Sequence, residues 1–195
     1  MSKNNLRPAP PSTASIDLGR TDAHFTEEVS QRADTPLRAC FHCQGCSNVC
    51  PFSQAMDLNP NALVRLVQLG LRQEALSCST IWICVGCHTC SNICPMTIDL
   101  AAMIDVLRHL ALEEEVEPAE PAIAEFHRQV LGSIQRHGRA HKLEIMLRHK
   151  FESGQWFSDL DLGLRMLAKR KLDLRPSRVE NLAEVKKLFA RPWQR

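Results

Sequence analysis

Apolar residues recur every three or four positions along most of the 195-residue chain, which is the spacing of amphipathic helices. The most regular stripe predicts a helix from its N-cap Asp99 to about Glu114. Its inward face is expected to be Leu100, Met103, Ile104, Leu107 and Leu110. The pattern suggests one β element, a short edge strand at residues 16–18. The expected fold class is therefore mainly α.

Further helical segments precede that stripe. Residues 26–33 predict a short helix capped by Thr26, with Phe25 and Val29 turned inward. The pair Asn59-Pro60 predicts a helix start, because asparagine caps well and proline fits the first turn. Gly70 is expected to end that helix, and a short helix follows at about 72–76. The buried face of the 60–69 helix is expected to be Leu63, Leu66, Val67 and Leu69.

The acidic, proline-containing stretch from Glu113 to Pro121 predicts a linker to a second helical part. Beyond the linker, a first helix is expected to begin near Ile123 and end near Gly138. Two more helices are expected over roughly 140–151 and 158–171, and a capping box at 177–180 predicts the start of a last one. The last helix is expected to turn inward Leu182, Val185, Leu188 and Phe189. The chain is thus predicted to have a flexible tail at 1–24, a helical domain at 25–115 and a C-terminal helical region at 116–195.

Two cysteine motifs interrupt the helical pattern and repeat each other. They read CFHCQGCSNVCP and CVGCHTCSNICP. Both have the spacing Cys-x2-Cys-x2-Cys-x3-Cys-Pro with which bacterial ferredoxins bind 4Fe–4S clusters. The cysteines are Cys40, Cys43, Cys46 and Cys50 in the first motif and Cys84, Cys87, Cys90 and Cys94 in the second. We therefore expect two 4Fe–4S clusters as cofactors.

The spacing also predicts how the cysteines are shared. Three cysteines two residues apart lie on one tight turn and can bind three irons of one cubane, while the fourth lies beyond its reach. In two-cluster ferredoxins the fourth cysteine binds the other cluster. Cluster I is therefore expected on Cys40, Cys43, Cys46 and Cys94, and cluster II on Cys84, Cys87, Cys90 and Cys50.

Other interpretations of the cysteines are weaker. A structural zinc site uses pairs of Cys-x2-Cys, so a third cysteine at that interval is superfluous. Disulfides are not expected without a secretory signal. Cys78 fits neither motif; it is either a small buried apolar residue, which we favour, or a redox-active thiol beside cluster II.

The residues around the motifs are assigned simpler roles. Trp82 and Ile83 come just before the second motif and are expected to shield cluster II from water. Both cubanes already have four thiolates, so His109 is interpreted as a surface or core-edge residue rather than a ligand. The scattered His137, His141 and His149 are interpreted as surface residues, with a weak metal site as the alternative.

Charge and composition limit the function classes. The formal net charge is +2, but eight thiolates and two cubane cores would bring the loaded protein to about −2. Residues 165–195 contain ten Lys and Arg residues and only three acidic residues. This basic region is either a solvated helical face or a docking surface for an acidic partner. Nucleic acid is not expected, because no recognised module or aromatic stacking pattern accompanies the charge. The sequence contains no run of eighteen apolar residues, so no transmembrane helix and no membrane partner are expected. The N-terminus does not have the pattern of a signal peptide, so a cytoplasmic location is expected.

Several catalytic signatures are missing from the sequence. Neither Gly-x-Gly-x-x-Gly nor a phosphate-cradling loop is present, so nothing indicates a built-in flavin or nicotinamide site. No two cysteines are adjacent, so the Cys-Cys-Gly signature of disulfide-reducing subunits is absent. No catalytic residue is assigned, and the chain is expected to accept and pass single electrons.

The order of motifs resembles the C subunit of heterodisulfide reductase. The resemblance rests on LVRLVQLGL, TIWICVGCHTCSNICP and IDLAAMIDVLRHLA, over about residues 25–115. The segments FHRQVLGSIQRHGRAHKLEIMLRHKF and RPSRVENLAEVKKLFA are similar to bacterial members, in particular those of sulfur oxidisers. The proline-rich N-terminus departs from the archaeal pattern. The resemblance implies an α-helical, ferredoxin-like dicluster domain with a C-terminal helical extension.

The resemblance also implies partners and a role. The chain would relay electrons between a flavin A subunit and a Cys-Cys-Gly B subunit in disulfide or sulfur metabolism, with a lipoate-binding protein as substrate carrier. Two alternatives stand beside this one. The chain could be the iron–sulfur subunit of another dehydrogenase, although the added domains of the succinate, glycolate and glycerol-phosphate types are absent. It could also be a structural subunit whose clusters brace the fold.

Overall fold

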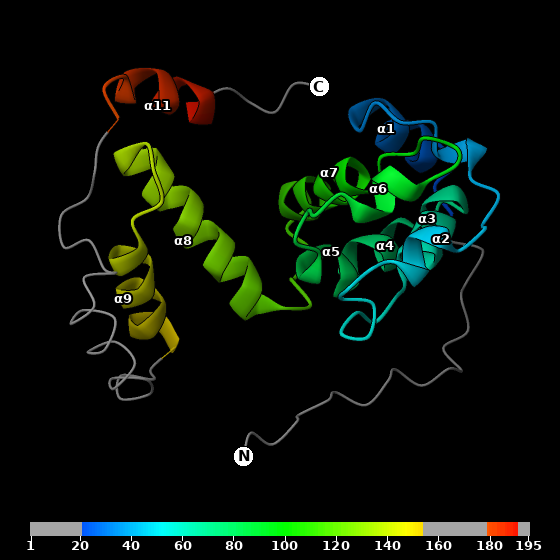
Figure 1. Cartoon of the computed structure of the whole chain (residues 1–195), viewed down its shortest axis with the longest axis horizontal. Helices are drawn as coiled ribbons and strands as arrows, with labels where there is room; N and C mark the ends of the chain where they lie inside the picture. The colour runs from blue at the N-terminus through cyan, green and yellow to red at the C-terminus, as the bar shows by residue number, and fades with distance from the viewer. Residues whose placement is uncertain (1–20, 154–178, 191–195) are drawn as a thin grey trace, which may run out of the picture. The chain divides into compact units, whose positions relative to one another are not determined.

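The computed structural model describes residues 21–153 and 179–190, which form helices and no strand (Figure 1). The expected mainly α fold is confirmed. Two compact units are present, the first ending at Pro121 and the second starting at Ala122. The predicted strand at 16–18 and the predicted helix at 158–171 lie outside the described residues. None of the described helices is long and apolar enough to cross a membrane.

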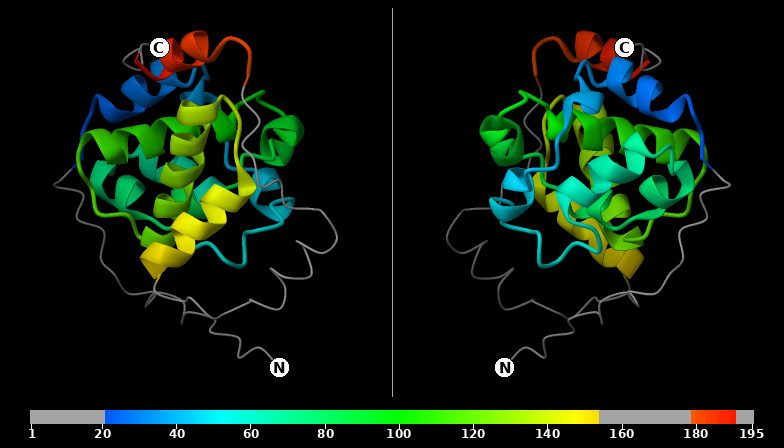
Figure 2. Two further views of the ribbon diagram at one scale, coloured as in Figure 1. Left: turned by 90° about the vertical axis from the view of Figure 1, so that its left-hand side faces the viewer. Right: turned by 90° about the vertical axis from the view of Figure 1, so that its right-hand side faces the viewer.

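The first unit is a bundle of short helices around one core. In chain order they are α1 (Phe25–Arg32), the 3-10 helix η2 (Leu37–Ala39), α2 (Gly45–Asn48), α3 (Pro60–Gln68), α4 (Arg72–Ser77), α5 (Thr80–Ile83), α6 (Thr89–Ile93) and α7 (Leu100–Glu113). Helices α1, α3, α4 and α7 pack together, while α2 and α6 lie side by side at one edge (Figure 2). The largest fully buried side chains include Phe25, Leu63, Leu71, Leu76, Ile81, Met103 and Leu107.

Helix α7 forms as its apolar stripe predicts. The Asp99 side chain accepts a hydrogen bond from the backbone N–H of Ala102 at 3.1 Å, which confirms the predicted cap. All five residues of the predicted stripe are buried. The helix supplies one wall of the core, and its first turn reaches the second cysteine motif.

Helix α3 begins and ends where predicted, but its cap differs. Pro60 is its first residue and Gly70, at φ +71°, follows its end. The Asn59 side chain makes no capping hydrogen bond; the Ser47 hydroxyl instead accepts the N–H of Asn61 at 3.0 Å. Leu69 is exposed, so its predicted place on the buried face is wrong.

Thr26 is not the cap of α1, contrary to the prediction. It is the second residue of the helix and is buried, and its hydroxyl donates to the carbonyl of Val67 at 2.7 Å. The hydroxyl thus joins α1 to α3 across the core. Folded structure also starts before residue 25, because the N–H of Asp22 donates to the carbonyl of Gly70 at 2.8 Å.

Arg72 ties three helices of the first unit together. Its guanidinium lies 2.7 Å from the Glu28 carboxylate of α1 and 2.8 Å from that of Glu114, just after α7. It also lies 3.2 Å from Asp22 and stacks 5.0 Å above the Phe25 ring. The hydrogen bond with Glu114 raises the pKa of Arg72 above its usual value. One cation therefore orders the N-terminal segment, α1 and the end of α7.

The second unit contains α8 (Pro121–His137), α9 (Lys142–Ser153) and α11 (Leu182–Ala190). Glu144 holds α8 and α9 together, with His137 at 2.9 Å and Arg136 at 3.0 Å. The side chain of His137 is only 16% exposed, so its predicted surface position is wrong. Leu188 and Phe189 of α11 are exposed rather than inward. The His149 side chain lies outside the described residues.

Candidate metal centres

Each cysteine motif turns through two left-handed residues at matching positions. In the first motif these are His42 and Gln44, at φ 59° and 62°. In the second they are Gly86 and His88, at φ 63° and 58°. A left-handed residue reverses the local direction of the chain, so each motif curls around a point instead of extending away from it.

The curled motifs form two pockets, and each pocket contains cysteines of both motifs. The cysteines that line pocket I are Cys40, Cys43, Cys46 and Cys94. Those that line pocket II are Cys84, Cys87, Cys90 and Cys50. The last cysteine of each motif thus lies with the first three of the other, which is the grouping that the spacing rule predicts.

The remaining lining of the two pockets consists of apolar residues and a few polar ones. Helices α3 and α7 contribute to both pockets, with Val64 and Leu100 in pocket I and Pro60 and Ile104 in pocket II. Four sulfur donors in an apolar cavity suit a cubane, whose corner irons each take one thiolate. In the part of the chain that the structure describes, no group of His, Cys, Asp and Glu is gathered closely enough to hold a single metal ion.

The thiols in the pockets differ in acidity. Burial raises the pKa of Cys46, Cys84 and Cys90, whereas a hydrogen bond with Thr89 lowers that of Cys87. Iron binds the thiolate, so loading these pockets must release protons from the buried thiols.

Two serines from the repeated Ser-Asn-x-Cys-Pro ending support the pockets. Ser47 accepts the N–H of Asn61 in the first turn of α3, and Ser91 accepts the N–H of Ala101, at 3.3 Å, in the first turn of α7. Each motif therefore caps the helix that follows it. Sequence reasoning missed this role, although the repeated serine was its visible signal.

A second pair of hydrogen bonds fixes the loops that lead into the motifs. The N–H of Asp57 donates to the Ser79 hydroxyl at 3.2 Å, and the N–H of Asp99 donates to the Thr35 hydroxyl at 2.9 Å. Burial opposes ionisation of Asp57, but hydrogen bonds from Ser79 and Thr80 hold its pKa below the usual value. The segment after each motif is thus tied to the segment before the other.

The prediction that Trp82 and Ile83 cover cluster II is wrong, because other residues line pocket II. Trp82 is 3% exposed and Ile83 is half-buried, yet neither lines a pocket. The apolar cover of pocket II comes from Phe52, Met56 and Val85. These residues lie within or after a cysteine motif, where helical periodicity does not reveal which side chains turn inward.

Cys78 is a buried thiol separate from both pockets. It is 4% exposed and donates to the carbonyl of Ala75 at 3.2 Å. Burial raises the pKa of Cys78 to about 11, so the thiol stays protonated at neutral pH. This supports the favoured interpretation as a small buried apolar residue.

The inert character of Cys78 leads to a prediction. Iodoacetamide should not label Cys78 in the folded, anaerobic protein at pH 7, because the reactive thiolate is scarce and buried. Cys78→Ala should retain its full iron content. Mass spectrometry of the alkylated protein and colorimetric iron assay measure the two effects. Rapid labelling at pH 7, or loss of iron in Cys78→Ala, would assign this thiol to the metal chemistry instead.

The segment that contains both cysteine motifs resembles a known protein family. Residues 36–98 match the family model of the 4Fe-4S dicluster domain, and this range includes both motifs and both pockets' cysteines. The chain carries a 4Fe–4S dicluster domain. Such a domain implies two 4Fe–4S clusters, and the cysteines for both are present.

The chain also has curated relatives. The chain is 27% identical over 112 residues to the C subunit of the H(2):CoB-CoM heterodisulfide,ferredoxin reductase of Methanothermobacter marburgensis, covering 57% of this chain and 60% of that protein. It is 26% identical over 124 residues to the iron-sulfur C subunit of the CoB--CoM heterodisulfide reductase of Methanopyrus kandleri, covering 60% and 62%. The match thus spans about three fifths of the curated relatives. The predicted resemblance to the C subunit of heterodisulfide reductase is confirmed.

Proposed function

We propose that the chain is an electron-transfer subunit of a heterodisulfide-reductase-like complex. It would relay single electrons between a flavin subunit and a Cys-Cys-Gly catalytic subunit, without catalysing the disulfide chemistry itself. The observation that supports this most is the pair of mixed cysteine pockets within a dicluster domain. Clusters bound there by Cys40, Cys43, Cys46 and Cys94, and by Cys84, Cys87, Cys90 and Cys50, supply one-electron redox chemistry.

The exposure of the pockets suits a relay with two partners. The second cysteine of each motif, Cys43 or Cys87, is exposed, while the other six are half-buried. Next to the first cysteine of each motif, Phe41 and Val85 are each 61% exposed. Each pocket therefore has a surface edge with an apolar side chain nearby, and apolar and aromatic side chains are common at protein interfaces.

The finer parts of the proposal come from the resemblance and from the names of the relatives. They are a B subunit with Cys-Cys-Gly motifs, a flavin A subunit, a lipoate-binding carrier and a role in sulfur oxidation. We place the protein in the cytoplasm because reduced thiols persist there. Most of the basic region at 165–195 lies outside the described residues, but Lys186 and Lys187 of α11 are exposed and available to an acidic partner.

The test is reconstitution with a Cys-Cys-Gly subunit under anaerobic conditions. The purified chain should contain about eight irons, as two cubanes require. After reduction, it should be reoxidised by the partner in stopped-flow absorbance, and Cys43→Ser and Cys87→Ser should slow this transfer while Cys78→Ala does not. Loaded clusters that no partner reoxidises would indicate a structural role. An iron content near zero would end the proposal.

A further inference from the structure

Two side chains satisfy equivalent backbone carbonyls in front of the two motifs. Arg108 of α7 donates to the carbonyls of Ile81 and Cys84. Gln68 of α3 donates to the carbonyl of Leu37 at 2.9 Å and lies 3.4 Å from that of Cys40. In both cases the acceptors are the first cysteine of the motif and the residue three positions before it. We call Gln68 and Arg108 the capping pair.

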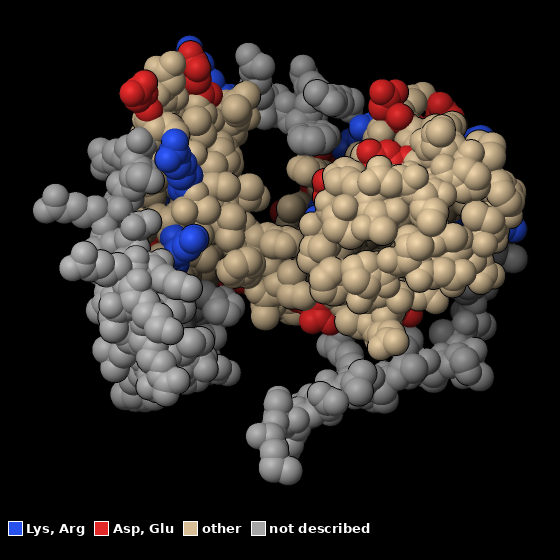
Figure 3. Space-filling model, viewed as in Figure 1, with Lys and Arg blue, Asp and Glu red and all other residues tan. Residues whose placement is uncertain are grey.

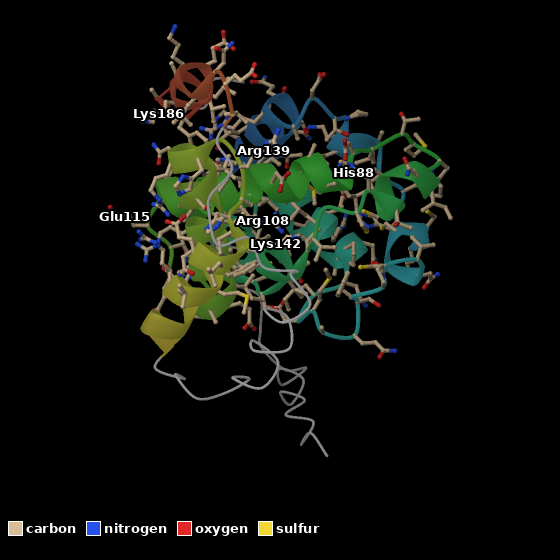
Figure 4. The ribbon with its side chains drawn as sticks, turned by 60° about the vertical axis from the view of Figure 1, so that its left-hand side comes forward. His88, Arg108, Glu115, Arg139, Lys142 and Lys186 are labelled. Atoms are coloured by element: carbon tan, nitrogen blue, oxygen red, sulfur yellow. The ribbon has the colours of Figure 1, made fainter. Side chains whose placement is uncertain are left out.

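The capping pair matches in geometry but differs in charge. Gln68 is neutral, and its amide oxygen lies within hydrogen-bond distance, 2.7 Å, of Nε2 of His42. Arg108, which is labelled in Figure 4, always carries a positive charge. Its side chain is only 15% exposed. The pseudo-symmetric domain therefore has a half-buried cation at pocket II where pocket I has an amide.

Other charges are scarce around the pockets. Among the described residues, neither lining includes Lys, Arg, Asp or Glu, and each includes one histidine, His42 or His88. Figure 3 shows the acids and bases of the first unit at the margins of the face in view. The cation of Arg108 is thus a large part of the difference between the two electrostatic environments.

Other charges near the motifs oppose this difference, and these charges are more exposed. Asp99 lies 3.7 Å from His88 of pocket II, and its side chain is 43% exposed. Asp57 is an exposed residue whose carboxylate accepts hydrogen bonds from the N–H groups of Ser79 and Thr80 ahead of the second motif.

Asp105 pairs with Arg108 at 2.8 Å, but its side chain is 54% exposed. On the side of pocket I, Arg65 approaches Gln68 at 3.4 Å and is also exposed. Solvent and salt screen exposed charges more than half-buried ones.

We propose that Arg108 makes cluster II the more easily reduced of the two clusters, so that the first electron entering the domain settles there. A reduced cluster carries one more negative charge than an oxidised one, and a nearby cation stabilises it. Arg108 acts through the backbone of Cys84, as a positioning residue and as a fixed charge. The inference rests on the proposed function and extends it to an order of filling.

An EPR-monitored redox titration of the loaded chain at pH 8, where histidines are mostly neutral, tests this. In the wild type, cluster II should be reduced first; the signal absent from Cys50→Ser identifies it. Arg108→Gln should lower the reduced-to-oxidised ratio of cluster II about tenfold at a fixed potential, which is about 59 mV for one electron. Cluster I should not change, and Arg108→Lys should shift cluster II less.

Further variants keep the result interpretable. Arg65→Gln removes an exposed cation and should leave both potentials unchanged. Asp105→Asn removes a carboxylate that is also exposed and should shift cluster II much less than Arg108→Gln does. If Arg108→Gln cannot be loaded, Arg108→Met, which also removes the cation, should lower the potential of cluster II in the same way. With about eight irons present, an unchanged cluster II in the loaded Arg108 variant, or cluster I reduced first in the wild type, overturns the inference and leaves the relay proposal standing. A wild-type chain without iron would instead refute the relay proposal.

Discussion

Cys50→Ser should remove cluster II and spare cluster I, although Cys50 belongs to the first motif. Its sulfur lines pocket II with Cys84, Cys87 and Cys90. Serine is a poor replacement for thiolate, so the cubane in that pocket should be lost or degraded. Iron should fall from about eight to about four per chain, with one of two EPR signals missing after reduction. Electron transfer through the chain should fall to background, because a relay needs both clusters.

Matched variants separate crossed ligation from ligation within one motif. If the pockets are mixed, Cys50→Ser and Cys87→Ser should lose the same EPR signal, and Cys94→Ser and Cys43→Ser should lose the other. If each motif held its own cluster, Cys50→Ser would behave as Cys43→Ser does. The second pattern would contradict the grouping seen in the pockets. Cys78→Ala is the control, since its thiol lines neither pocket.

The helical part of the structure was predictable because periodic burial determines it. The stripe on α7 and the Asn-Pro start of α3 each combine an apolar period with a local signal at the helix end. The crossed grouping of cysteines was also predictable, since it follows from how far a tight turn can reach. Both depend on short-range geometry that spacing alone encodes.

The residues that sequence reasoning missed make polar contacts between separate elements. Thr26 belongs to a residue type that commonly caps helices. Its hydroxyl instead donates a hydrogen bond to a carbonyl of α3 that is 41 positions away. Arg108 appears as one more charge on an amphipathic helix, whereas its partners lie 24 and 27 positions earlier. His137 appears as one of several scattered histidines, but it pairs with Glu144 of the next helix. Polar contacts between separate elements have no periodic signature.

Gly70→Ala should strongly destabilise the first unit. Gly70 has φ +71°, and a Cβ there would lie 2.3 Å from the carbonyl oxygen of Asp22. That oxygen belongs to backbone that Gly70 itself anchors, through the 2.8 Å hydrogen bond from the N–H of Asp22. Relief of the clash must move Asp22 away and weaken its ion pair with Arg72. We expect a loss of about 3 kcal/mol or more in the free energy of unfolding, from strain and clash together.

Gly86→Ala is the matched control for this loss. Gly86 has a similar φ of +63°, but nothing lies within 4 Å of the position of a Cβ. Only the left-handed strain of alanine remains there, which costs about 1 kcal/mol. Thermal unfolding followed by circular dichroism, on samples with equal iron content, should therefore show a Tm at least about 10 °C lower for Gly70→Ala than for Gly86→Ala. Equal losses in the two variants would mean that backbone strain alone acts at Gly70, and that Asp22 does not pack against α3 as the structure shows.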